Sequence, residues 1–488
     1  MGRGKPNIRV PAKAIRHGGE DRLSKLPGDI LLTILERLDI REAARTSILS
    51  RQWRQIPSML NKLVIKVRSF EPNKDDRSKI TLDDLARANA TVHEAIRTIL
   101  SGRRNFRQYP LHRLCLQFYL GDESSSSIVQ TVGYIMESQM VGSAEFTILT
   151  KKEHAHCTED DVLYHGQQLM SLFEVSPNAF GGLTRLKLEN VSLNEPDLLN
   201  IFSVCKRLEF LRLFDSDMGI LSSMEVEHPR LSELEIVDCR FDRVHLKWLP
   251  KLTMLTFEMW ISRRDPLSFG YVPLLRSLSL TNIGLSWHKM LKLSDFLGNV
   301  TVNSLQLNFN SEKIWVLPEG PKELLPVFRK LRLVDLVDIS EECDLNWTMF
   351  ILQGAPSLEE LHITVRDHFC EMMMDEELRE QYAYSKEKGV DWEGATSDFK
   401  HNKLTVLKIF GFRPEDKFVR YVRSVIKAAV NLEDIFLYNR LVCEMCKHVV
   451  PRASRFPLPK KQRFSLRNRI TSGIDSFAVI HFPHLSSN

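Results

Sequence analysis

The chain has 488 residues, of which 43% are hydrophobic and 26% charged, a balance that is ordinary for a folded protein with a sizeable core. No apolar run approaches the roughly 18 residues that a membrane span needs, and no apolar segment follows the basic N-terminus, so we predict neither a membrane anchor nor a secretory signal. The formal net charge is only +5 and no zinc-finger or aromatic–basic signature is present, so we expect no nucleic-acid partner.

The N-terminal residues 1–20 are basic and lack an apolar core segment, so we predict a disordered leader there. The 8 cysteines are scattered along the chain and show no secretory context. Reduced, buried thiols are therefore expected, which indicates an intracellular protein of the nucleus, the cytoplasm or both.

Three short helices are predicted between residues 26 and 57. Pro27 suits the first turn of the first helix, and Ile30, Leu31 and Ile34 belong to one apolar stripe along it. A second helix begins near residue 40 behind a D-x-x-E pattern, and a third, "RQWRQI", ends at Pro57. Three helices of this size cannot bury all of their apolar side chains. The surplus must be covered by the rest of the chain or by a partner, and the residues alone leave both possibilities open.

Residues 21–57 closely resemble the F-box of plant F-box proteins, over the whole motif. One departure is Gly28, where that family more often has an acidic residue. The resemblance implies that the apolar face docks on the Skp-family adaptor of a cullin–RING ubiquitin ligase, and the alternative is a helical cap on the following domain. The expected adaptor-binding residues are Leu26, Pro27, Ile30, Leu31, Ile34, Leu35, Ile48, Leu49 and Trp53.

A single pattern, L-x-x-L-x-L, returns along residues 58–400, which we predict to be one repeat body. From 183 to 358 its starting positions step by 25, 23, 21, 23, 27, 29 and 27 residues. A fixed motif at that interval is typical of leucine-rich repeats, with the regular part at 183–365. The expected fold is therefore α/β: an N-terminal three-helix F-box followed by a leucine-rich-repeat solenoid, a right-handed superhelix with parallel strands on its concave face.

Each motif should supply one strand whose side chains alternate between two faces. The fourth and sixth positions are predicted to enter the solenoid core, and the third, fifth and seventh to face the concave surface. On that surface the aromatic, cationic and thioether side chains of Phe210, Arg212, Phe214 and Met254 could form a contact patch for a protein substrate, since aromatic residues and arginine dominate such patches. The alternative is that connecting segments cover these rings.

Three segments depart from the regular repeats. Residues 81–100 predict an amphipathic helix, and the charged, partly helical insertion at about 371–402 predicts a long exposed loop. Residues 401–440 predict strand, helix and strand, and they resemble the FBD region of plant F-box/leucine-rich-repeat proteins, which implies a C-terminal cap. Residues 441–488 form a basic tail, in which "SFAVIHF" could add a further strand.

No constellation in the sequence predicts catalysis or a bound cofactor. Cys443, Cys446 and His448 lack the second ligand pair of a zinc site, and His154 and Cys157 lie far away along the chain. Phosphate-binding and nucleophile motifs are absent. We therefore expect no metal, no cofactor and no enzymatic activity in this chain.

Together the resemblances imply a substrate-recognition subunit of a cullin–RING (SCF-type) ubiquitin ligase. The F-box would bind a Skp-family adaptor and, through it, the cullin and RING subunits, while the repeats would recruit an unknown protein substrate. Two alternatives stay open: a repeat scaffold that binds proteins outside any ligase, and a small-molecule-sensing F-box receptor.

Overall fold

The structure is a computed structural model in which the described part of the chain is discontinuous. The described residues are 26–35, 37–38, 42, 45, 60–72, 80–103, 111–121, 123–138, 141–219, 222–366, 368, 376–392, 399–439, 456–457 and 459–483. The side chains of 28, 32, 35, 101–103 and 376 are outside this description.

The repeated L-x-x-L-x-L motif forms the strands of one long parallel sheet, as predicted. Within the described residues the sheet has 14 strands, and neighbours in space follow chain order except where a second sheet intervenes. In spatial order the strands are β1 (Lys62–Lys66), β2 (Leu111–Tyr119), β3 (Val141–Leu149), β4 (Leu183–Glu189), β5 (Phe210–Phe214), β7 (Glu233–Val237), β9 (Met254–Glu258), β11 (Ser277–Thr281), β12 (Ser304–Asn308), β13 (Leu333–Ser340), β14 (Glu360–Arg366), β15 (Val406–Phe410), β16 (Asp434–Leu437) and β17 (Val479–His481).

A smaller parallel sheet accompanies the middle repeats. Its three strands, in the order β10, β8, β6, are β6 (Ser223–Glu227), β8 (Arg243–Trp248) and β10 (Leu267–Tyr271). In these repeats the return segment from one strand of the main sheet to the next is itself extended, whereas in the flanking repeats it is helical. A consecutive run of strand–strand repeats, from β5 to β10, therefore lies between strand–helix repeats.

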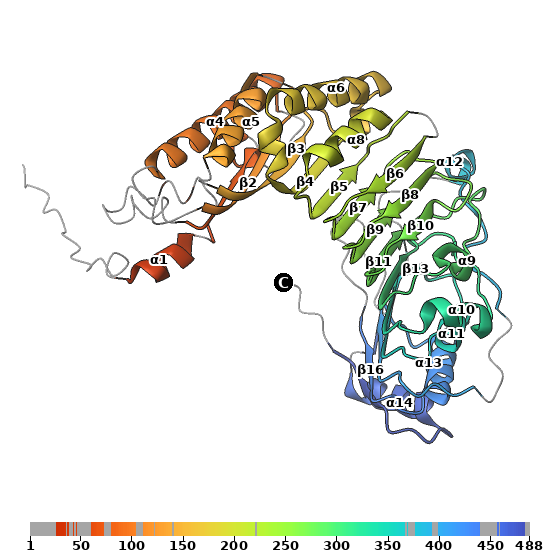
Figure 1. Cartoon of the computed structure of the whole chain (residues 1–488). Helices are drawn as coiled ribbons and strands as arrows, with labels where there is room; N and C mark the ends of the chain where they lie inside the picture. The colour runs from red at the N-terminus through yellow and green to blue at the C-terminus, as the bar shows by residue number, and fades with distance from the viewer. Residues whose placement is uncertain are drawn as a thin grey trace, which may run out of the picture.

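Helices cover the outer side of the curved array, and the main sheet lines its inner side (Figure 1). The α-helices are α1 (Gly28–Leu35), α4 (Leu82–Arg103), α5 (Glu123–Glu137), α6 (Glu159–Val175), α7 (Pro177–Gly181), α8 (Glu195–Val204), α9 (Leu293–Leu297), α10 (Pro321–Phe328), α11 (Met349–Gly354), α12 (Glu376–Gln381), α13 (Asp416–Ala428) and α14 (Lys460–Thr471). Among the described residues, short 3₁₀ segments are η2 (Val67–Phe70), η4 (His154–His156) and η5 (Leu345–Thr348). The predicted helix at 81–100 corresponds to α4.

Side-chain alternation along the strands follows the expected rule. In β4, Leu186 and Leu188 are buried in the core, whereas Arg185, Lys187 and Glu189 are partly exposed on the other face. The same core positions recur in each repeat, and their leucines stack into one continuous apolar cluster from β1 to β17. One repeat cannot bury these leucines alone, so the fold is stabilised by contact between neighbouring repeats.

The residue that follows the strand motif adopts a left-handed backbone conformation in many repeats. Asn190 and Asp238 have φ of 54° and 53° there, and Gly411 has φ of 77°. This conformation is costly for most residues and least so for glycine, asparagine and aspartate. The backbone N–H of Asn190 then donates to the backbone carbonyl of Phe214 in the next strand, at 3.0 Å. The eighth position of the motif therefore turns the chain out of the sheet while keeping one more hydrogen bond between repeats.

The region 401–440 forms strand, helix and strand, as predicted. These elements are β15, α13 and β16, and the helical stripe Phe418, Val422 and Val425 is buried in the main core. The buried hydroxyl of Tyr421 on the same helix shares a hydrogen bond of 2.7 Å with Thr348 of η5. The helix is thereby fixed against the preceding repeats.

The expectation of a merely basic tail after residue 440 is wrong for the part that is described. Helix α14 packs against α13, and β17 pairs in parallel with β16, so the array continues to residue 481. One of its basic residues has a structural contact: the guanidinium of Arg467 donates to the carbonyl of Ile480 at 2.9 and 3.1 Å. The "SFAVIHF" strand is confirmed as β17.

The insertion at about 371–402 is also more ordered than the sequence predicts. Its described part, which includes α12, is anchored by backbone hydrogen bonds from Ser286 to Ala383 (2.7 Å) and from Ile314 to Lys388 (2.8 Å). Arg379 forms an ion pair of 2.6 Å with Glu312, whose side chain is only 2% exposed. The segment therefore packs against the loops that follow β11 and β12. Its partly helical character is confirmed by α12, and the prediction that it is exposed is corrected for the described part.

Candidate protein-binding surfaces

Helix α1 belongs to a small apolar cluster that is separate from the solenoid core. Leu31 is 0% and Leu60 4% exposed, and Leu26, Ile34 and Leu38 pack around them. Ile30, on the same helix, is 43% exposed. The helix thus buries one apolar side, whereas the side chains of Ile30 and Pro27 remain exposed on its surface.

The predicted adaptor-binding residues therefore divide into three groups. Pro27 and Ile30 are exposed, and Leu26 and Ile34 are partly exposed. Leu31 is fully buried against Leu60, so its expected place on an open face is corrected: it supports the helix from beneath. The side chain of Leu35 and the residues Ile48, Leu49 and Trp53 lie outside the described part of the chain.

The concave face of the sheet is the second candidate surface, and its pairing register fixes which side chains are neighbours. The fifth motif positions form one row, in which Arg212 pairs with Glu235, Glu235 with Thr256, and Thr256 with Ser279. Side chains in such a row stand about 4.8 Å apart, the spacing of adjacent strands. Contacts along a row therefore decide which groups on this face are free to bind.

Phe210 is on this face but is not accessible, so its predicted role as an exposed contact is corrected. Its ring is 1% exposed, and the guanidinium carbon of Arg185 lies 3.8 Å from the ring centroid. Lys187 lies over the same ring at 5.3 Å. Two cations of the preceding strand therefore cover the ring that the sequence placed in a contact patch.

The remaining residues of the predicted patch are also largely engaged within the chain. Arg212 pairs with Glu235 at 3.2 Å, just as Arg185 pairs with Glu233 at 3.2 Å. Phe214 is partly exposed and makes an edge contact of 5.3 Å with the ring of His154. Met254 is the exception, since it is 45% exposed. The patch is brought together by β4, β5, β7 and β9, but its charges are already neutralised by one another.

Two carboxylates further along the concave face differ from these paired ones. The side-chain carboxylates of Glu258 on β9 and Asp335 on β13 make no ion pair or hydrogen bond with any other described residue. Burial raises the pKa of Glu258, and the negative charges of Asp238 and Glu235 add to the effect that Arg212 opposes. Burial likewise raises the pKa of Asp335, with Asp338 adding and His362 and Lys408 opposing. Sequence reasoning missed both residues because their lack of a partner depends on neighbouring strands.

Aromatic rings form a stack at the C-terminal end of the concave face. The rings of Phe410 and Tyr438 lie 4.3 Å apart and nearly parallel, and Phe436 stacks on His481 at 4.6 Å. All four side chains are partly exposed. The signal in the sequence was the recurrence of aromatic residues at outward positions of consecutive strands.

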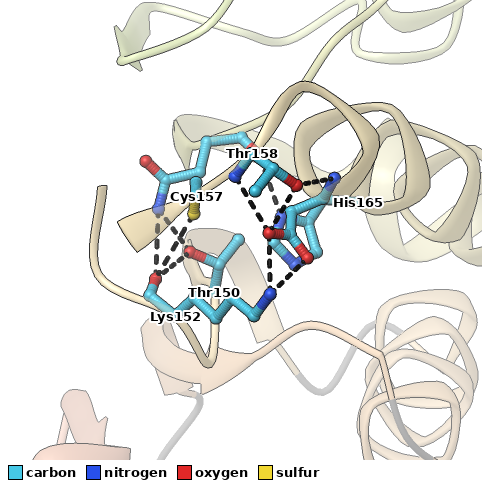
Figure 2. Close-up of polar contacts among 7 residues, drawn as sticks. Thr150, Lys152, Cys157, Thr158 and His165 are labelled. Carbon is cyan, nitrogen blue, oxygen red and sulfur yellow. Dashed lines mark hydrogen bonds and ion pairs between the residues drawn. The ribbon is translucent and has the colours of Figure 1, made fainter. Parts of the chain in front are cut away.

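A polar network orders the connection between β3 and α6 at the edge of the same face (Figure 2). Lys152 donates to both oxygens of Asp161, at 2.6 and 2.7 Å, and Asp161 caps α6 together with Thr158. These hydrogen bonds hold the pKa of Asp161 well below its ordinary value. His165 lies beneath, with its Nδ1 3.0 Å from the carbonyl oxygen of Asn190, and burial lowers its pKa.

This network is structural in character. Burial raises the pKa of the Cys157 thiol, which disfavours the reactive thiolate, and the thiol points to the carbonyl of Lys152. Across the described residues no group of three His, Cys, Asp or Glu side chains is arranged to hold a metal ion. Cys443, Cys446 and His448, which we considered as metal ligands, lie outside those residues. The helices of the described part include none that is both long and apolar enough to cross a membrane.

Comparison with known proteins agrees with this architecture. Residues 172–462 match the family model "At1g61320/AtMIF1, LRR domain", and residues 23–64 match the F-box domain model. The F-box/FBD/LRR-repeat protein At1g13570 of Arabidopsis thaliana is 24% identical over 89% of this chain and 97% of its own length. The Arabidopsis F-box/FBD/LRR-repeat proteins At3g52680 and At4g00160 are 24% and 26% identical, each over 71% of this chain and 72% of their length.

Proposed function

Since the chain belongs to the plant F-box/leucine-rich-repeat proteins with FBD-like relatives, we propose that it is the substrate-recognition subunit of a cullin–RING (SCF-type) ubiquitin ligase. Its F-box would bind a Skp-family adaptor, and its repeats would bind the protein to be ubiquitinated. Catalysis would reside in other subunits. This chain would contribute proximity, which turns an encounter between separate molecules into a reaction within one complex.

The observation that carries the proposal is the separation of the F-box helix from the solenoid core. The cluster of Leu31 and Leu60 shares no member with the core cluster of the repeats. The exposed Ile30 is therefore available to a partner without unfolding of the repeats, and exposed aliphatic groups next to polar ones are typical of such contacts. Leu26, Pro27 and Ile34 flank it on the same helix start.

Co-expression with a Skp-family adaptor tests the proposal directly. The unmodified chain should form a complex that survives size-exclusion chromatography. Ile30→Glu should abolish the complex, because it places a charge in the contact without disturbing the buried Leu31. Leu199→Glu, on α8, is the matched control, since Leu199 is 60% exposed and far from the F-box in the fold.

The result separates the ligase role from the two alternatives. If the chain binds no adaptor, or if Ile30→Glu binds as well as the unmodified chain, the adaptor-docking proposal is wrong and a scaffold role gains support.

A small-molecule receptor would need a cavity among the concave strands. A cavity of about 500 Å³ lies elsewhere, between β10 and the segment that follows α9, and no residue of the main sheet lines it.

A further inference from the structure

The middle of the concave face carries a row of polar, uncharged side chains. Thr256, Ser279 and Gln306 occupy the fifth position of consecutive strands and are direct neighbours in the pairing register, and Gln306 is followed by Asp335. None of the three side chains makes a hydrogen bond to another described residue. Their hydroxyl and amide groups are thus available on a partly exposed surface, where water or a partner must satisfy them.

Two unpaired carboxylates flank this row: Asp335 continues it beyond Gln306, whereas Glu258 lies two residues beyond Thr256 on the same strand. Glu258 is the seventh residue of the β9 motif, and Asp335 is the fifth residue of the β13 motif. The acids nearby are already paired: Glu235 with Arg212 at 3.2 Å, and Glu360 with Lys408 at 3.1 Å. The cations on this part of the face are thus occupied, and they offset only part of the cost that burial imposes on Glu258 and Asp335. A cation brought by a partner would offset the rest of that cost.

We propose that the acidic stretch formed by Thr256, Glu258, Ser279, Gln306 and Asp335 binds an extended, basic segment of the target protein, with one arginine or lysine at Glu258 and another at Asp335. This inference rests on the proposed function, because it names the chemistry of the target that the repeats recruit. The side chains of Thr256, Ser279 and Gln306 bind the backbone of the segment between its two cations.

The spacing of the strands defines the segment. Glu258 and Asp335 are three strand intervals apart, because β11 and β12 lie between β9 and β13. At about 4.8 Å per interval the separation along the array is roughly 14 Å, and the two-residue offset along the strands brings the direct separation to about 16 Å, which an extended chain covers in about four to five residues. The preferred motif is therefore two basic residues separated by three others, crossing the strands along the length of the array.

Binding of labelled synthetic peptides to the purified full chain tests the inference. The probes are three glycine–serine peptides that carry, at positions separated by three residues, two arginines, two glutamines or two glutamates. Fluorescence anisotropy should show binding of the arginine peptide that weakens with added salt, and at least about tenfold weaker binding of the other two. Equal binding of the three peptides, or no binding of the arginine peptide, overturns the inference.

Matched variants locate the contact. The double variant Glu258→Gln/Asp335→Asn should lose the preference for arginine, whereas Glu174→Gln/Glu323→Gln, which alters exposed acids on α6 and α10, should keep it. Charge reversal by Glu258→Lys/Asp335→Lys should shift the preference to the glutamate peptide. Thermal unfolding of each variant confirms that it is folded. Retention of the arginine preference by the folded double variant contradicts the assignment.

The outcome is independent of the ligase role. If these variants bind the adaptor normally but no arginine peptide is bound by the unmodified chain, only the target chemistry is wrong. If the arginine peptide binds as expected while the adaptor does not, the concave site stands and the F-box proposal fails.

Discussion

The guanidinium of Arg185 lies 3.8 Å from the centre of the Phe210 ring and also pairs with Glu233 at 3.2 Å, so one side chain joins three consecutive strands. The ring is 1% exposed although it stands on the concave face. A cation over an aromatic ring protects it from water while leaving a polar surface. This arrangement closes the Phe210 ring to apolar partners.

Arg185→Ala should uncover the Phe210 ring and leave Glu233 without its partner. We expect a loss of about 1 kcal/mol in the free energy of unfolding, the combined scale of a partly exposed ion pair and a cation–π contact. Urea unfolding measures it. Arg332→Ala is the control, since Arg332 pairs with Glu359 at 3.7 Å on the surface with no ring beneath it, and its loss should stay below about 0.5 kcal/mol. Equal losses for the two variants would contradict the role of the ring.

Met259 should be a site where stability can be gained. It occupies the eighth motif position with φ of 57°, where other repeats have asparagine, aspartate or glycine. Met259→Asn should raise the free energy of unfolding by about 1 kcal/mol, because asparagine tolerates the left-handed conformation better. Met254→Asn, at an exposed strand position, should give no such gain. A fall in stability for Met259→Asn would show that the thioether contact with Asn310, at 3.5 Å, outweighs the backbone term.

Acid should destabilise the array through two equivalent histidines. His228 and His401 each precede a strand motif by three residues; the Nδ1 of each accepts a backbone hydrogen bond of 3.0 Å, from Leu231 and Leu404 respectively, while Nε2 donates to a carbonyl. Burial lowers the pKa of both below the ordinary value of 6.5. The unfolded chain therefore binds protons first as the pH falls.

The stability due to these histidines is complete above pH 6.5 and is lost as the pH falls below it toward the lowered pKa values. Urea unfolding between pH 7.5 and pH 5 should show a midpoint that falls as the pH drops below the ordinary histidine pKa. Replacing both residues by glutamine should flatten this dependence. The matched replacement of the exposed His156 should leave it unchanged, and the same slope in both variants would rule out the assignment.

The ion pair between Arg379 and Glu312 should decide whether the insertion stays attached. Arg379→Met leaves a carboxylate that is 2% exposed without its partner, which should cost about 3 kcal/mol. Adding Glu312→Gln should recover much of that loss. Limited proteolysis should cut the insertion faster in the single variant than in the double one. An unchanged cleavage rate in Arg379→Met would mean that the other contacts suffice.

The architecture was predictable because its determinants are local and repeated. Leu186, Leu188 and their equivalents recur at fixed spacing, so strand positions and the buried face follow from the sequence. The predictions that were wrong concern contacts between segments that are distant in the sequence. Phe210 is covered by Arg185, which belongs to another repeat, and the tail residue Arg467 looks like surface charge until β17 brings the carbonyl of Ile480 to it. The unpaired state of Asp335 is likewise a property of the strands around it.

The order of the strands determines which part of the array unfolds last. In an array where each repeat touches only its neighbours, unravelling begins at the ends and progresses inward. Strands β9 to β13 stand well inside the order from β1 to β17, so terminal fraying reaches them last. The acidic stretch should therefore stay folded when the repeats at either end of the array unfold locally.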